Sequence, residues 1–132
     1  MPDQTIEMLR RAYEGFGRMD VPAILSVLSE DVKWDATDAF AHRGLFRGHD
    51  GVSEYLQSLS AVWEQFELEP DEFIQSSDGH QMMVLGEIRG RLRATGENVK
   101  ARFAHVGRLE DDKVTVLKIC LDREGAERFM EG

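Results

Sequence analysis

Apolar residues recur every three or four positions in the first half of the chain, and this spacing predicts three amphipathic helices. The helical segments lie near residues 5–16, 20–28 and 49–63. Asp20 is a typical N-cap residue, and Pro22 fits the first turn of the second helix. Each helix is expected to place one face against a hydrophobic core.

After Glu64 the apolar positions alternate with polar ones, which predicts strands. The alternation continues through residues 66–121 and is interrupted by turn signals, so a long antiparallel meander is expected. Asp78 and Gly79 form a strong hairpin turn signal. Pro70 lacks a backbone N–H and is expected at a bend or on an edge strand.

Two short elements complete the predicted order: a strand near residues 32–36, and a C-terminal helix that Asp122 would cap. The order predicts a single α+β domain over residues 1–132, in which helices pack on one face of a curved, mostly antiparallel sheet. No internal repeat, low-complexity tract or linker divides the sequence.

His105 is the most informative single residue. Within residues 99–106, Val99, Ala101 and Phe103 alternate with polar side chains, and His105 shares their apolar face. A buried imidazole must be hydrogen-bonded to offset its desolvation, and its pKa is easily tuned near neutrality. His105 is therefore either a pocket residue with a chemical role or a core or interface histidine, and the sequence leaves both interpretations open.

Charge and composition argue against several classes of function. A net charge of −9 at pH 7 argues against a nucleic-acid-binding surface. No apolar run approaches the roughly 18 residues of a membrane span, and no signal peptide is apparent, so a cytoplasmic protein without a membrane partner is expected. Cofactor-binding motifs and metal-ligand spacings are absent, so neither a cofactor nor a metal is expected.

Four segments, taken in their order and spacing, resemble the SnoaL-like group of the nuclear-transport-factor-2-like superfamily, which includes ketosteroid isomerase and the polyketide cyclases. They are Tyr13–Phe16 with Asp20, Glu30–Trp34, Phe46–Val52, and Phe103–Val106 with Asp112–Val114. The resemblance implies a cone-shaped α+β barrel around an apolar pocket. It does not settle the function, because this fold carries isomerases, cyclases, hydrolases and non-catalytic binding domains.

The resemblance also implies homodimers paired through the outer face of the sheet. By strand alternation that face combines apolar and basic residues, a mixture suited to burial against a second copy. Its members are Arg102, Ala104, Val106, Val116, Lys118 and Cys120. Cys120 is the single cysteine of the chain, which excludes an internal disulfide, and it is expected to be a contact residue.

The catalytic residues of these relatives carry over only in part. Ketosteroid isomerase has a tyrosine on the first helix, an aspartate base on the first strand and an acid in its oxyanion hole. The resemblance places Ala12, Ala36 and His105 at these positions. The cyclases similarly have a histidine at the position of His105, but their acid/base aspartate corresponds to Ile119. Neither mechanism transfers intact.

The candidate catalytic residues are His105, as a hydrogen-bond donor or general base, and Asp38. If the first strand continues to Asp38, this residue lies on the same strand face as Trp34 and points towards the pocket mouth; a place in the loop is the alternative. Tyr55 lies on the apolar face of the third helix, where it is either a ligand contact or an ordinary core residue. The expected pocket lining comes from helices and strands alike. It consists of Phe16, Trp34, Tyr55, Leu59, Trp63, Ile88, Phe103, Leu117 and Ile119.

These features predict a protein with a pocket for a small, largely apolar carbonyl or polyketide-like compound. As an enzyme it would carry out cofactor-free isomerisation, aldol-type cyclisation or hydration, with His105 as the polar group of the pocket. The alternative is a non-catalytic ligand-binding or dimerisation domain, which Ala12 and Ala36 favour. Epoxide hydrolysis ranks last, because the inward-facing positions supply no Asp–Arg–Asp constellation.

Overall fold

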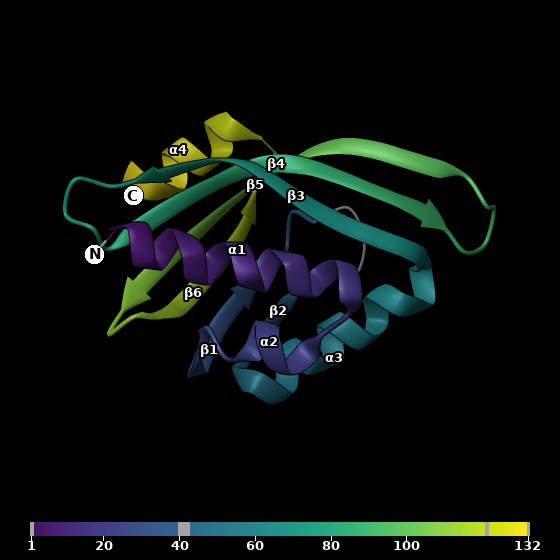
Figure 1. The fold of residues 1–132 in the computed structure, drawn as a ribbon, viewed down its shortest axis with the longest axis horizontal. Coiled ribbons are helices and arrows are strands. Elements are labelled where there is room, and N and C mark those ends of the chain that lie inside the picture. Colours follow the sequence, from purple (N-terminus) through teal and green to yellow (C-terminus); the bar gives the residue numbers. More distant parts are fainter. Residues whose placement is uncertain (1, 40–42, 121, 132) are drawn as a thin grey trace.

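The curved sheet and its flanking helices follow the order that the hydrophobic pattern predicts (Figure 1). The computed structural model describes residues 2–39, 43–120 and 122–131. The elements are α1 (Pro2–Arg18), α2 (Val21–Leu25), β1 (Leu28–Asp35), β2 (Leu45–Arg47), α3 (Gly48–Val62), β3 (Trp63–Gln75), β4 (Gln81–Leu92), β5 (Asn98–Glu110), β6 (Lys113–Cys120) and α4 (Arg123–Glu131).

The six strands form one sheet in the order β2-β1-β6-β5-β4-β3. Only the β1–β6 pairing is parallel among these described strands, so the expectation of an α+β fold with a mostly antiparallel sheet is confirmed. The sheet is curved but not closed, because β2 and β3 form its two edges. Pro70 lies on edge strand β3 at a register shift, as its missing N–H predicts.

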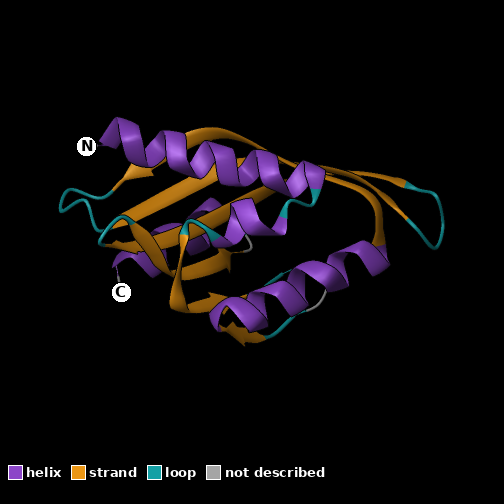
Figure 2. Ribbon diagram, turned by 60° about the horizontal axis from the view of Figure 1, so that its bottom comes forward, coloured by secondary structure: helices purple, strands orange, loops and turns teal. Residues whose placement is uncertain are grey.

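The core lies between the inner face of the sheet and the first three helices. α1 packs along β3 and α3 packs on β1 and β2, so these two helices flank the inner face (Figure 2). The Asp20 carboxylate accepts a hydrogen bond from the Ala23 N–H at 3.3 Å and caps α2 as expected. No helix among the described residues is long and apolar enough to cross a membrane.

Two glycines of β4 make room for aromatic rings over the inner face. A Cβ at Gly86 would lie 2.6 Å from the Phe103 ring, and a Cβ at Gly90 would lie 2.6 Å from the Trp63 ring. Real Cβ atoms do not approach other atoms this closely, so only glycine allows the two rings to lie directly on the strand. Both rings become walls of the cavity described below.

The C-terminal helix α4 packs on the outer face of the sheet, opposite α1 (Figure 1). Ala104, Val106 and Cys120 are buried there in one apolar cluster with Ala126 of α4. The prediction that these three strand residues form a dimer interface is wrong. The three residues do lie on the outer face of the sheet, as the strand alternation predicts, but α4 of the same chain covers them.

Candidate functional site

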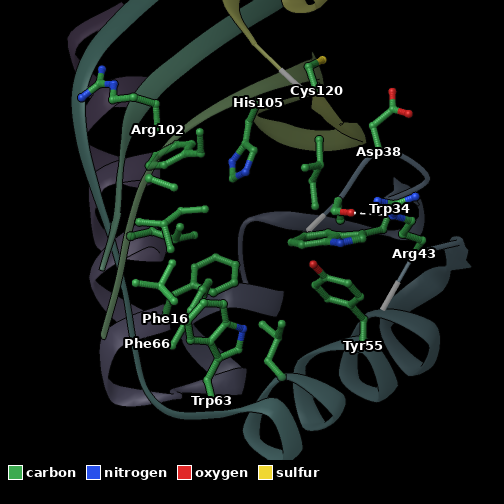
Figure 3. A pocket seen from close by; sticks show the side chains of 18 residues that line it. Phe16, Trp34, Asp38, Arg43, Tyr55, Trp63, Phe66, Arg102, His105 and Cys120 are labelled. Carbon is green, nitrogen blue, oxygen red and sulfur yellow. Dashed lines mark hydrogen bonds between the residues drawn. The ribbon is translucent and has the colours of Figure 1, made fainter. Parts of the chain in front are cut away.

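A mainly apolar cavity of about 320 Å³ lies between the inner face of the sheet, α1 and α3 (Figure 3). Most of its wall is aromatic, and the rings come from both the helices and the strands. The aromatic lining consists of Phe16, Trp34, Tyr55, Trp63, Phe66 and Phe103. Such a wall favours a flat or polycyclic apolar ligand, with a few polar groups to fix its orientation.

His105 extends from β5 into this cavity (Figure 3). The residue is only 6% exposed, and the Tyr13 hydroxyl of α1 lies 2.8 Å from its Nδ1 atom. The imidazole also lies against the Phe103 ring, at a centroid distance of 4.5 Å. Burial lowers the pKa of His105 to about 3, so the imidazole is neutral at physiological pH.

The hydrogen bond to Tyr13 fixes which nitrogen of His105 carries the proton. Burial raises the pKa of Tyr13, so its hydroxyl keeps its hydrogen. Among the described residues this hydroxyl has one hydrogen-bond partner, His105 Nδ1, and a buried O–H without an acceptor is costly. We infer that Tyr13 donates to Nδ1. The proton of the neutral imidazole is then on Nε2, and His105 offers an N–H donor rather than a base.

The residue of the first helix that contacts His105 is Tyr13, the neighbour of Ala12. Ala12 is buried in the core, and it is Tyr13 whose side chain reaches His105. A tyrosine of the first helix therefore contacts the histidine. The signal was present, because Tyr13 shares the apolar helix face with Leu9 and Phe16.

Asp38 lies at the rim of the cavity, and its carboxylate points away from the interior (Figure 3). Its Oδ2 atom pairs with Lys118 Nζ at 3.2 Å, and Asp35 Oδ1 lies 3.4 Å from the same nitrogen. Burial opposes the charge of Lys118, but the two carboxylates outweigh it and raise the pKa of the lysine. Asp38 is thus held in an ion pair and does not face a ligand in the cavity.

Tyr55 and Trp34 form a second polar group in the cavity wall. Their ring centroids are 5.6 Å apart, and the Tyr55 hydroxyl points from α3 towards the cavity (Figure 3). Burial raises the pKa of Tyr55 to about 12, and the Trp34 N–H acts in the opposite direction. Trp34 Nε1 is buried and makes no hydrogen bond of standard geometry within the described part of the chain.

The structure brings together nearly all of the residues that the sequence predicts for the pocket. Those that line the main cavity are Phe16, Trp34, Asp38, Tyr55, Leu59, Trp63, Ile88, Phe103, His105 and Ile119. Leu117 lines instead a small neighbouring cavity of about 20 Å³ behind Tyr13 and His105. The prediction missed Phe66 and Leu68, although their alternation along β3 indicates the same inner face, and Arg43 at the rim.

No site for a metal emerges from the geometry of the described residues. Over residues 2–39, 43–120 and 122–131, no three histidine, cysteine, aspartate or glutamate side chains come together as metal ligands. Cys120 borders the cavity but belongs to the outer cluster under α4, and burial raises the pKa of its thiol to about 11. A neutral, covered thiol is a poor nucleophile.

The sequence matches the SnoaL-like domain over residues 9–117. No curated protein matches the chain significantly. An NTF2-like protein of unknown function from Burkholderia pseudomallei K96243 is 30% identical, with 96% of this chain and 95% of that chain covered and a TM-score of 0.78. TerC, co-crystallised with polyporic acid, is 27% identical, with 97% and 98% covered and a TM-score of 0.78.

A more distant structure shares the fold alone. It is a protein with a ketosteroid isomerase-like fold from Catenulispora acidiphila DSM 44928, in complex with trimethylamine. It is 11% identical, with 91% of this chain and 88% of that chain covered and a TM-score of 0.77.

Proposed function

Because the chain belongs to the SnoaL-like domain family, we propose that its cavity binds a small, largely apolar carbonyl compound. The neutral imidazole of His105, held by Tyr13 inside an aromatic cavity, carries this proposal. His105 Nε2–H donates to the ligand's carbonyl oxygen, and the rings pack against its skeleton. The similarity to TerC, which was co-crystallised with polyporic acid, supports a ligand of this kind.

A neutral donor in a mainly apolar cavity suits cofactor-free proton transfer next to the carbonyl. As a proton leaves the α-carbon, negative charge develops on the oxygen, and a preorganised N–H stabilises it. Isomerisation and aldol-type cyclisation both pass through such an enolate. His105 supplies the donor, and Asp38 is the carboxylate at the rim that would have to turn inward to act as the base.

Non-catalytic ligand binding is the second candidate, and the state of Asp38 favours it. This carboxylate is paired with Lys118 and faces away from the cavity. The resemblance places the aspartate base of ketosteroid isomerase at Ala36, where this chain has no acid. Deuterium exchange at the α-carbon of 1-tetralone, followed by NMR in D₂O, separates the candidates. Faster exchange with wild type but not with Asp38→Asn indicates catalysis, whereas binding without faster exchange indicates a binding protein.

Replacing His105 with phenylalanine is expected to weaken the binding of 1-tetralone about ten- to hundredfold. The variant keeps the apolar packing but leaves the ligand's carbonyl oxygen buried without a donor, at a cost of about 1–3 kcal/mol. Binding can be followed by tryptophan fluorescence, because both tryptophans of the chain line the cavity. His80→Phe, at an exposed turn, is the matched control and should bind like wild type.

Unchanged affinity in His105→Phe, with a folded circular dichroism spectrum, would contradict the proposal. A shift in oligomeric state without a change in affinity would instead identify His105 as an interface residue.

We further propose a homodimer paired through the part of the outer sheet face that α4 leaves uncovered. On this uncovered part of the face, Arg89 pairs with Glu87 and Arg102 pairs with Asp71, so the surface carries both positive and negative charges. A surface with both signs can be complementary to itself about a two-fold axis. Sedimentation equilibrium at micromolar concentration is expected to give about twice the 15.0 kDa chain mass, and a monomer would contradict this proposal.

A further inference from the structure

A second cavity, of about 20 Å³, lies behind the hydrogen-bonded pair of His105 and Tyr13. We call it the back cavity. His105 borders both this space and the main cavity, and the other walls of the back cavity come from α1, β4, β5 and β6. Its aliphatic lining consists of Leu9, Met82, Val84, Leu109, Val114 and Leu117. The proposed carbonyl contact at His105 does not use this space.

The back cavity owes its space to Gly107 of β5, which also lines it. Gly107 lies opposite Met82 on β4 and Leu117 on β6, so a side chain at this position would stand between them. A Cβ at Gly107 would lie 3.7 Å from Val114 Cγ1, which is an ordinary van der Waals contact. Gly107 does not have a positive φ, so its backbone does not require glycine. An alanine fits here, and its absence leaves the space open.

The walls of the back cavity offer little to a water molecule. Tyr13 Oη and His105 Nδ1 lie 2.8 Å apart and bond to each other, and the backbone of β5 pairs with β4 and β6 along this stretch. A buried water molecule needs about two to four polar partners, and roughly 10–15 Å³ is enough to hold one small molecule. An apolar cavity of sufficient size stays dry and binds apolar atoms such as xenon.

We propose that the back cavity is a binding site for one uncharged, apolar gas molecule of the size of xenon or dioxygen. Such a molecule needs no hydrogen bond, and it restores dispersion contacts that the walls of an empty space lack. Met82 has a flexible thioether side chain, which can shift to fit the guest. The site is separate from the main cavity and does not rest on the proposed function.

Methyl NMR of the wild-type protein under xenon pressure tests this proposal. In the described structure Val84 and Val114 border the back cavity, whereas Leu59 and Ile88 border the main one, so the two pairs of methyl groups report on different spaces. The resonances of Val84 and Val114 are expected to shift with increasing xenon pressure until the site is saturated.

Gly107→Ala is expected to abolish these shifts, because the added methyl group fills the back cavity. Gly17→Ala is the matched control. Its Cβ would also lie 3.7 Å from the nearest atom, Glu67 Cγ, but at a position that does not border the cavity, so this variant should shift like wild type. If Gly107→Ala does not fold, Val114→Ile extends the aliphatic wall into the same space, and Val84 remains as the reporter.

Three results would overturn the proposal. The first is a wild-type spectrum in which xenon shifts only Leu59 and Ile88, which would place the gas in the main cavity alone. The second is a shift of Val84 that persists in the folded Gly107→Ala variant. The third is a nuclear Overhauser effect from a bound water molecule to the methyl groups of Val84 or Val114, which would show that the back cavity is hydrated.

Discussion

The free energy of unfolding is expected to fall by about 3 kcal/mol between pH 6.5 and pH 4 because of His105 alone. Burial lowers the pKa of His105 to about 3 in the folded protein, whereas the ordinary value is 6.5. Between these values the unfolded chain binds a proton that the folded chain does not, so acid favours unfolding. Each pH unit in this window contributes about 1.4 kcal/mol, and the stability is fully present above pH 6.5.

His105→Phe is the variant that isolates this effect. Asp35 and Asp71 also have lowered pKa values. At Asp35, burial raises the pKa, but hydrogen bonds to Thr37 and the charge of Lys118 outweigh it; at Asp71, the hydrogen bond and the charge of Arg102 lower the pKa. Their protonation destabilises both proteins alike at low pH. Urea unfolding followed by circular dichroism is expected to show a weaker pH dependence in the variant. Parallel pH profiles for the two proteins would show that His105 is not held neutral by burial.

Local patterns were sufficient to predict most of the fold. The helix beginning after Asp20, the edge position of Pro70 and the alternation along residues 99–106 each follow from properties of a few neighbouring residues. Strand β2 (Leu45–Arg47) was missed, because three residues are too short to show a period. The sequence also did not reveal that the sheet stays open or where α4 packs, since an amphipathic helix does not specify which apolar surface it covers.

The site was harder to predict than the fold, because its decisive contacts join distant parts of the chain. Alternation placed His105 on the apolar face of its strand, but its hydrogen-bond partner Tyr13 lies 92 residues away. The ion pair that turns Asp38 from the cavity involves Lys118, 80 residues further on. Leu117 shares the strand parity of Ile119 and still lines a different cavity, because a curved sheet directs successive inner positions to different spaces.

Replacing Phe103 with alanine is expected to lower the free energy of unfolding by about 3–5 kcal/mol. Phe103 is 5% exposed, stacks on Tyr13 at 5.7 Å and covers His105 at 4.5 Å. Its ring lies directly on Gly86, where no Cβ can fill the space that the substitution leaves. The same change opens the histidine to water, so the pKa of His105 is expected to rise towards 6.5, since burial is what lowers it.

Phe66→Ala is the matched control. Phe66 lines the same cavity but is only half-buried and packs on Trp63 and Phe16, away from the histidine. The Phe66→Ala variant is expected to lose less of its free energy of unfolding than Phe103→Ala, and the pKa of its His105 is expected to stay unchanged. Urea unfolding measures the stability, and an NMR titration of the His105 ring protons measures the pKa. Phe103→Leu, which keeps most of the apolar volume, serves if the alanine variant does not fold. A pKa of His105 that stays near 3 in the folded Phe103 variants would show that the ring does not exclude water from the imidazole.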